Sequence, residues 1–280
     1  MINPDFKITI VGLGLLGGSY AMGLSKKGYK VKAIDINKDN LDYALNAGWI
    51  IEGSDDPRLV NDADIVIFCL YPDTLIKWLK THQHELKSHA ILTDVTGVKR
   101  SIISKIDEFL RDDVSFVYSH PMAGKEVSGA KYADTEIFKN ANFIIIENDD
   151  KDAMKTIREL SETLEFANTT VLDAKSHDEM ISFVSQLTHV IAVCLMNTSD
   201  NTHLKDYTGD SFRDLTRIAK INENLWYELF IQNKDMLIKE IEAFIKEVNH
   251  FKDVLSDDDE EEMKRLFRQS TERRKVFDKK

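Results

Sequence analysis

Two short segments carry the side chains whose types and spacing suit chemistry. His120 lies two residues after the apolar run from Ser115 to Tyr118. A histidine side chain has an ordinary pKa of about 6.5, so it can take a hydroxyl proton while hydride leaves the same carbon. Asp214 and Arg217 lie three residues apart in a helical pattern. The carboxylate can then orient the guanidinium, which is suited to binding a substrate carboxylate through two hydrogen bonds.

A polar stripe lies between these two segments, on a helix pattern that is otherwise apolar. Asp178, Ser182, Ser185, Gln186 and His189 recur there at helical spacing. Because buried polar groups need hydrogen-bond partners, such a stripe is expected to line a wet cavity.

Each candidate also has an interpretation without catalytic meaning. His120 could cap the loop that follows it, and Arg217 could form a surface ion pair, the common outcome for such a pair on a helix. His189 could be a hydrogen-bonded core histidine, and Lys99 could be solvent-exposed. The joint occurrence of these residues is what favours an active site.

A glycine pattern near the start of the chain indicates a dinucleotide site. Gly12, Gly14 and Gly17 follow an apolar run and open a helical pattern. This arrangement allows a tight turn, a close approach to a pyrophosphate and a close helix–strand contact. The second apolar run ends in Asp35, and no arginine follows directly. An acidic residue there binds a ribose diol and repels a 2′-phosphate, so NAD is favoured over NADP.

The elements that must position these residues follow from the pattern of apolar runs. The runs that predict buried strands are Phe6–Val11, Val31–Ile34, Ile65–Leu70, Ala90–Thr93, Ser115–Tyr118 and Phe143–Ile146. Helical patterns lie between them at Leu15–Lys27, Lys38–Ala47 and Pro72–Leu79. Alternating strands and helices predict an α/β fold, a Rossmann-type doubly wound parallel sheet.

The second part of the chain is predicted to be all-helical. From Lys175 onward the sequence shows no convincing strand. We expect an NAD-binding domain over residues 1–172, a helical substrate and dimerisation domain over 173–255, and a charged tail over 256–280. Residues 223–250 hold one apolar stripe that would form a helix about 42 Å long, and a second subunit could pack against it. The tail is expected to be a solvated helix or a partly disordered end.

Composition excludes several classes of function. A formal net charge of -11 argues against nucleic acid as a partner. The sequence shows no cysteine and histidine spacing typical of a metal site, no signal peptide and no apolar run approaching the roughly 20 residues that span a bilayer. Cys69 and Cys194 lie in apolar runs and are expected to be buried free thiols. These observations predict a cytoplasmic protein without metal.

Beyond its individual residues, the chain resembles the prephenate and arogenate dehydrogenases, members of the wider 6-phosphogluconate dehydrogenase-like group. The segments that carry the resemblance are Gly12–Ser19, Asp94–Lys99, Ser119–Gly124 with Glu126 and Ser128–Gly129, Phe212–Ala219, and Trp226. The resemblance covers both expected domains, and the segment Phe212–Ala219 is close to diagnostic of the family.

The resemblance implies roles for particular residues. His120 would act as base on the ring hydroxyl, Arg217 would bind the ring carboxylate with Asp214 holding it, and His189 would contact the side chain of the substrate. The remaining candidates are Ser119 and Thr96 at the catalytic centre, Arg213, Trp226 and Gln186 for substrate, and Gly12, Gly14, Leu15, Leu16, Gly17, Asp35, Leu70, Asp94 and Val95 for NAD.

Two positions depart from the family pattern. Gly97 stands where the family often has a serine whose hydroxyl helps to orient the catalytic histidine, and Thr96 or Ser119 could supply that hydroxyl instead. Gln186 replaces the first histidine of the helix motif, which affects recognition of the substrate side chain.

The implied reaction is the NAD-dependent oxidative decarboxylation of prephenate to 4-hydroxyphenylpyruvate, in tyrosine biosynthesis. Arogenate, giving tyrosine directly, is the alternative substrate. A β-hydroxyacid dehydrogenase would need a catalytic lysine, and Lys175 and Lys205 lack a matching motif. A non-catalytic NAD-binding sensor is supported only by Gly97. The expected partners are a small-molecule substrate and a second copy of the chain, joined through the helical domain.

Overall fold

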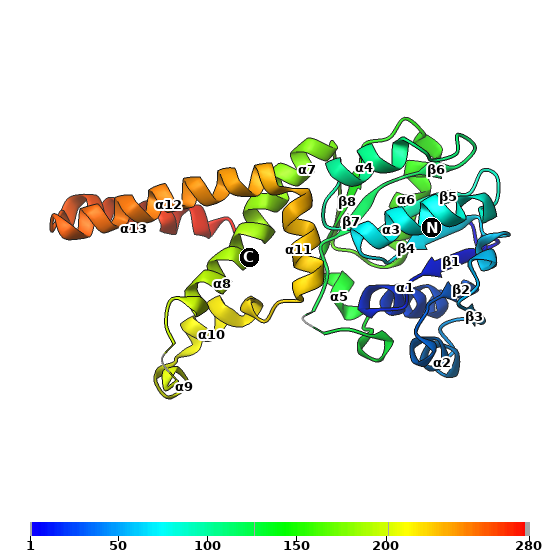
Figure 1. The fold of residues 1–280 in the computed structure, drawn as a ribbon, viewed down its shortest axis with the longest axis horizontal. Coiled ribbons are helices and arrows are strands. Elements are labelled where there is room, and N and C mark those ends of the chain that lie inside the picture. The colour runs from blue at the N-terminus through cyan, green and yellow to red at the C-terminus, as the bar shows by residue number, and fades with distance from the viewer. Residues whose placement is uncertain (1, 126, 201, 278–280) are drawn as a thin grey trace. The chain divides into compact units, whose positions relative to one another are not determined.

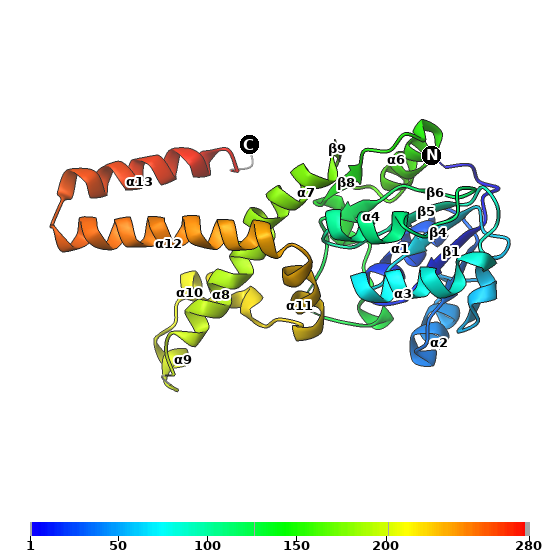
Figure 2. The ribbon, with the colours of Figure 1, turned by 45° about the horizontal axis from the view of Figure 1, so that its top comes forward.

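The computed structural model describes residues 2–125, 127–200 and 202–277. The chain divides into two compact units, Met1–Asn233 and Lys234–Lys280. The second unit consists of α12 (Lys234–Ser256) and α13 (Glu260–Lys275), which lie side by side as a hairpin (Figure 2). His250 and Glu262 join these two helices through a 3.1 Å hydrogen bond. The domain boundaries expected at residues 172 and 255 stay a prediction.

A parallel sheet forms the centre of the first unit (Figure 1). Its strands are β1 (Ile8–Val11), β2 (Val31–Ile34), β3 (Glu52–Ser54), β4 (Ile65–Phe68), β5 (Ile91–Asp94) and β6 (Ser115–Phe116), in the order β3-β2-β1-β4-β5-β6. In register, Ile8 lies opposite Val31 on one side and Ile65 on the other. The strand order reverses between β1 and β4, where such sheets bind ligands beyond the carboxyl ends of their strands. The predicted Rossmann-type sheet is confirmed.

Alternate side chains of the central strands pack into two different apolar cores. Ile67 of β4 belongs to one core and Phe68 to the other. The helices that contribute to the first core are α1 (Leu15–Lys26), α2 (Lys38–Asn46), α5 (Glu136–Lys139) and α6 (Lys151–Thr163). Those that contribute to the second are α3 (Pro72–His82), α4 (Arg100–Asp107) and α11 (Glu223–Gln232). Burial on both faces explains why the strands read as continuous apolar runs.

A second, smaller sheet follows the parallel one, and the strand expected at Phe143–Ile146 belongs to it and not to the parallel sheet as predicted. It contains β7 (Ser119–Pro121), β8 (Asn142–Ile146) and β9 (Asn168–Leu172). β7 pairs with β8 in antiparallel register, and β8 pairs with β9 in parallel. The run assigned to one strand at Ser115–Tyr118 therefore ends as β6 at Phe116, and the chain continues into the other sheet as β7. The strands β3 and β9 were missed because their Glu-Gly-Ser and Asn-Thr-Thr residues carry little apolar signal.

Helices alone follow β9 among the described residues, as predicted. In the first unit they are α7 (Ala174–Ile181), a π-helical segment (Ser182–Leu187), α8 (Thr188–Asn197), α9 (Leu204–Tyr207), α10 (Asp210–Thr216), a 3₁₀ turn (Arg217–Ala219) and α11 (Glu223–Gln232). The expectation of one helix over residues 223–250 is wrong, because α11 ends at Gln232 and α12 begins at Lys234. Asn233 separates them, and its buried side-chain amide donates to the backbone of Asp178. The expected tail forms the helix α13.

One helix departs from the expectation about membrane segments. By length and composition alone, Ala174–Asn197 is long and apolar enough to cross a membrane, although no unbroken apolar run pointed to it. The core helix of a globular protein passes the same test. In this helix 28% of the apolar window is buried, and Asp178 and Gln186 are buried and bond to other parts of the protein. The same helix exposes Cys194, and Cys69 is only partly buried, so the expectation of two buried thiols is wrong.

The glycine loop provides a test of the packing between α1 and the sheet. A Cβ atom at Gly17 would lie 1.8 Å from the carbonyl oxygen of Gly12, which itself has a φ of +97°. Gly17→Ala should therefore lower the free energy of unfolding by about 1–3 kcal/mol, the usual cost of overpacking. Gly124→Ala is the matched control, because a Cβ there meets nothing within 4 Å. Urea denaturation measures both variants, and equal stability of the two would refute the close contact.

Candidate active site

A cavity of about 660 Å³ opens beyond the carboxyl ends of the parallel strands. Its walls come from the segments after β1, β4 and β5, from β7 and the loop that follows, from the π-helical segment, and from α11 with the turn before it. The cavity therefore lies at the reversal of strand order, where the fold predicts a ligand.

The structure brings most of the candidate residues to this cavity. Those that line it are Gly14, Leu15, Leu16, Gly17, Leu70, Val95, Thr96, His120, Gln186, His189, Arg217 and Trp226. Gly12, Asp35, Asp94 and Ser119 lie behind the wall or beside it, and Arg213 and Asp214 lie elsewhere. Glu126 lies outside the described residues.

The glycine loop has the geometry of a dinucleotide site. Gly12 turns the chain after β1, and its N–H donates to the carbonyl of Ile34 at 2.7 Å. The next N–H, from Leu13, donates to the carboxylate of Asp35 at 2.6 Å. Gly14 begins α1 without a side-chain cap, so the first N–H groups of this helix face the cavity. Such a helix N-terminus attracts phosphate.

His120 extends from β7 and lies at the cavity wall. Its Nδ1 atom is 2.9 Å from Nε2 of His177. The other ring nitrogen, Nε2, faces Gly97, where a Cβ atom would lie 3.7 Å away. Burial, followed by the nearby His177 and Lys99, holds the pKa of His120 well below its usual range. The imidazole is therefore neutral at neutral pH and able to accept a proton.

His177 connects His120 to a buried carboxylate. Its Nδ1 atom lies 2.8 Å from Oδ1 of Asp178, and neither side chain has any exposed surface. Asp178 also accepts the backbone N–H groups of Lys99 and Arg100, each at 2.9 Å, at the start of α4. The carboxylate thus fixes α7 to the first turn of α4.

The hydroxyl groups of Ser119 and Thr96, which were expected to orient His120, bond elsewhere. Ser119 donates to the carbonyl of Asp94 at 2.8 Å, and Thr96 donates to the carboxylate of the same residue. Lys99 is fully buried rather than solvent-exposed, and its ammonium donates to that carboxylate at 2.6 Å and to the carbonyl of Ser119 at 2.6 Å. Because Asp94 gathers all of these donors, neither hydroxyl is directed at the imidazole.

Gln186 also differs from its expected role. Its amide nitrogen donates to the carbonyl of Leu229, and its amide oxygen accepts from Asn233, both at 2.9 Å. Both ends of the amide thus hold the π-helical segment against the end of α11. Half-buried His189 packs against Trp226 with ring centroids 3.6 Å apart and a tilt of 31°, so this pair forms the aromatic part of the wall.

The helical pair of Asp214 and Arg217 does not form as expected. α10 ends at Thr216 and Arg217 begins a 3₁₀ turn, so the two side chains do not share a helix face. Asp214 is exposed, and the described residues show no ion pair between it and Arg217. Arg217 itself lines the main cavity.

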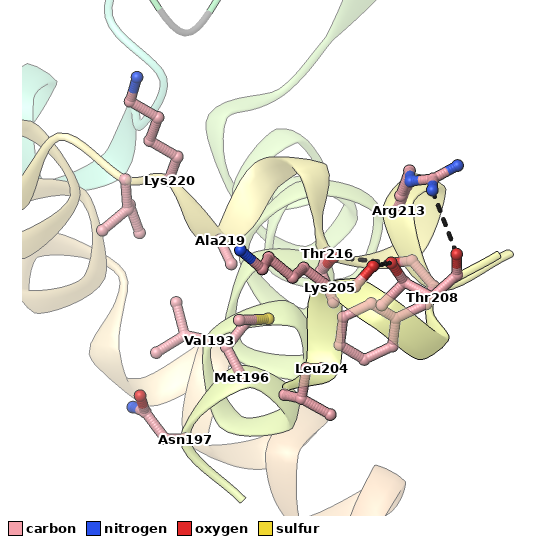
Figure 3. A pocket seen from close by; sticks show the side chains of 12 residues that line it. Val193, Met196, Asn197, Leu204, Lys205, Thr208, Arg213, Thr216, Ala219 and Lys220 are labelled. Atoms are coloured by element: carbon pink, nitrogen blue, oxygen red, sulfur yellow. Dashed lines mark hydrogen bonds between the residues drawn. The ribbon is translucent and has the colours of Figure 1, made fainter. Parts of the chain in front are cut away.

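Arg213 lies at a second cavity, of about 560 Å³, formed by α8, α9 and α10. Its guanidinium donates to the carbonyl of Thr208 at 3.1 Å (Figure 3) and to Asp210 at 3.0 Å. The side chain is 63% exposed. These contacts place Arg213 away from the glycine loop and His120.

Sequence reasoning missed His177 and the buried Lys99. His177 lies one position off the polar stripe, next to Asp178, and a His-Asp pair at the start of an apolar helix is the signal that was available. Nothing in the local pattern around Lys99 indicates its burial. Among the described residues, no group of three or more His, Cys, Asp or Glu side chains could hold a metal ion.

Comparison with known proteins gives a consistent family. Residues 20–171 match the model of the prephenate dehydrogenase nucleotide-binding domain, and residues 173–269 match that of the prephenate dehydrogenase dimerization domain. The prephenate dehydrogenase of Bacillus subtilis is 28% identical over 93% of this chain and 73% of its own length. That of Lactococcus lactis is 28% identical over 97% of this chain and 77% of its own length.

Solved structures that resemble this chain include a member of the same family. The structure of prephenate dehydrogenase from A. aeolicus in complex with hydroxyphenyl propionate and NAD+ is 29% identical, with a TM-score of 0.89 over 98% of each chain. Synechocystis arogenate dehydrogenase, 22% identical, has a TM-score of 0.83 over 97% of this chain and all of its own, and shows the shared fold. Since the family models together match most of its length and both of its parts, this chain belongs to the prephenate dehydrogenase family.

Proposed function

We propose that this chain oxidises prephenate with NAD and releases the ring carboxylate as CO₂, giving 4-hydroxyphenylpyruvate for tyrosine synthesis. The observation that carries the proposal is a single cavity lined by the glycine loop, His120 and Arg217. The reaction needs a bound dinucleotide, a base for the ring hydroxyl and a cation for the substrate carboxylates. All three groups meet at this cavity.

NAD fits the first part of the cavity. The uncapped start of α1 would bind the pyrophosphate, and Asp35 would bind the ribose hydroxyls and disfavour a 2′-phosphate. Leu70 and Val95 line the adjoining wall, while Gly12 and Asp94 shape it from behind. Bound there, the nicotinamide supplies the hydride acceptor. The A. aeolicus relative solved with NAD+ supports this assignment.

His120 would accept the proton of the ring hydroxyl. Its low pKa keeps the imidazole unprotonated at neutral pH, and its Nε2 lies on the side of Gly97, which also lines the cavity. Proton removal pushes electrons toward the carbonyl that forms as hydride leaves. Without this base the hydroxyl oxygen would develop positive charge in a buried site.

The substrate would be held by cations and aromatic rings on the helical side. Arg217 would bind the ring carboxylate, and the pair of His189 and Trp226 would contact the side-chain end. Lys220 adds positive charge to the same wall, where the ammonium of Lys125 is paired with Asp134 at 2.7 Å. These groups offset a net charge of -11, which would otherwise repel a dianion.

The protons of the reaction balance within the site. The C–C bond to the ring carboxylate breaks after oxidation, and its electron pair makes the ring aromatic and leaves charge on the oxygen. That oxygen can take back the proton that His120 accepted, so the base is regenerated in each cycle. Loss of CO₂ and the gain of an aromatic ring make the step effectively irreversible.

Arogenate is the second candidate substrate. It shares the ring, the hydroxyl and the ring carboxylate with prephenate, and the two differ only by an amine in place of a keto group on the side chain. An arogenate dehydrogenase shares this fold. His189, at the end of the cavity assigned to the side chain, is the residue placed to distinguish the two compounds.

A homodimer in the cytoplasm is the proposed working form. The second part of the chain matches a dimerization domain. In α12 the apolar side chains of Ile245, Val248 and Leu255 are 52%, 50% and 60% exposed, as expected of a face that another subunit covers.

The direct test of the proposed function is NADH formation, followed at 340 nm, with prephenate, arogenate and 3-hydroxyisobutyrate compared side by side. We expect turnover on prephenate, and the ratio to arogenate then measures the side-chain preference. Binding of NAD without turnover on either cyclohexadiene would contradict the proposal and favour a sensor. Turnover on 3-hydroxyisobutyrate alone would point to a β-hydroxyacid dehydrogenase.

His120→Asn tests the base. An asparagine can still donate to His177, but it cannot accept a proton, so kcat should fall by about 10² or more while NAD affinity stays nearly unchanged. Steady-state rates and calorimetric titration with NAD measure the two quantities. A parallel loss of NAD binding would show that the residue supports the cofactor site instead.

Arg217→Ala tests the carboxylate site. Loss of a charge-assisted hydrogen bond, about 1.5–3 kcal/mol, should raise KM for prephenate roughly 10- to 100-fold. Arg58→Ala serves as a control for removing a positive charge, because Arg58 is exposed and paired with Asp56 outside the cavity. An unchanged KM in the Arg217 variant would remove this residue from the substrate site.

A further inference from the structure

The imidazole of His120, at the cavity wall, begins a chain of three side chains whose other two members are fully buried. Its Nδ1 lies 2.9 Å from Nε2 of His177, whose Nδ1 in turn lies 2.8 Å from Oδ1 of Asp178. The two rings meet edge to face, with centroids 5.2 Å apart. His177 and Asp178 have no exposed surface, so water does not compete for these bonds.

The carboxylate end determines the direction of every bond in the chain. Asp178 already accepts two backbone N–H groups, one on each oxygen, and a carboxylate can only accept. His177 must therefore donate from Nδ1, which leaves its Nε2 as an acceptor in the neutral ring. His120 must then donate from Nδ1, so its Nε2 carries no proton.

The nitrogen left bare is the one that can reach a substrate. A Cβ atom at Gly97 would lie only 3.7 Å from Nε2 of His120, and both residues line the cavity. Because glycine has no side chain, this face of the ring stays open. The second and third members of the chain lie on the opposite side, at Nδ1.

We propose that His177 is a positioning residue, which with Asp178 holds His120 in the tautomer whose Nε2 is a bare base facing the cavity. The proposal rests on the proposed function for its catalytic meaning, while the tautomer itself is a property of the free protein. It assigns to a histidine on α7 the orienting role that neither Ser119 nor Thr96 can fill.

One proton moves between the substrate and His120 in each cycle. When the substrate O–H bond breaks, its proton bonds to Nε2 of His120, and the positive charge is shared through Nδ1–H with His177. Asp178 exchanges no proton in this step, and the same proton returns from Nε2 to the product oxygen. The other charges facing the pair are Lys99 with Asp94, Arg100 at the start of α4, and Arg217 across the cavity.

The test uses nuclear magnetic resonance of nitrogen-labelled histidines in the full-length protein, with neither NAD nor substrate added. In the unaltered protein we expect His120 as the Nδ1–H tautomer. In His177→Leu, which fills the space without an acceptor, the Nε2–H tautomer should appear. His177→Gln keeps an oxygen that can accept and an amide that can donate, so it should restore the first tautomer. His84→Leu, at an exposed site outside the cavity, is the matched control.

The value of kcat should depend on which tautomer His120 adopts. We expect kcat to fall at least tenfold in His177→Leu and to recover to within about threefold in His177→Gln, with KM and NAD affinity little changed. A purely structural role for His177 would instead lower stability and NAD affinity and leave the tautomer of His120 unchanged.

The outcomes separate this proposal from the proposed function. An Nε2–H tautomer in the unaltered protein, or an Nδ1–H tautomer that persists in His177→Leu, would overturn the role of His177, whatever the substrate. The expected tautomers without turnover on prephenate or arogenate would leave the chain of bonds intact and contradict the reaction. If His177→Leu does not fold, the tautomer of His120 in the unaltered protein and in His177→Gln still tests the proposal.

Discussion

The active site depends on one buried carboxylate, that of Asp178. A charge without exposed surface is tolerated only when hydrogen bonds replace its water, and Asp178 receives them from two N–H groups at the start of α4 and from His177. Its own backbone carbonyl accepts from Asn233, at the break after α11. A single residue therefore ties α7 to the sheet domain, to the end of α11 and to the base. Movement of α7 would cost the carboxylate these partners, so the helical wall of the cavity is held in place.

A second buried charge fixes the other side of His120. The ammonium of Lys99 bonds to Asp94, at the end of β5, and to the carbonyl of Ser119, in β7. It thereby joins the two sheets at the point where the chain passes from one to the other. The base follows directly after Ser119, so its backbone position is determined by this bond while its ring is determined by His177. Lys99 links the two sets of contacts, because its backbone N–H also donates to Asp178, and holding both backbone and ring is what a precise proton transfer requires.

The sequence predicted the fold well wherever local pattern decides it. The apolar runs located the buried parallel strands, and the spacing of Gly12, Gly17 and Asp35 located the dinucleotide loop, because the steric demands there are local. Prediction failed where contacts between distant segments determine the orientation of a side chain or the end of a helix. Ser119 carries a suitable hydroxyl, yet its orientation depends on Asp94, on another strand. The helix break at Asn233 depends on buried polar partners on α7, which no local apolar stripe reveals.

The site separates two kinds of positive charge that its chemistry needs. Attraction of an anionic substrate to a chain of net charge -11 calls for fixed cations, and Arg217 and Lys220 provide them at the wall. Proton transfer calls for a group that is neutral before the step and charged only during it. Burial beside Lys99 lowers the pKa of both His120 and His177, so this pair adds no standing charge. Asp178, at the far end, then stabilises the charge only when the proton arrives. A permanently charged base would bind substrate but could not accept its proton, so a neutral buried pair beside fixed surface cations satisfies both demands.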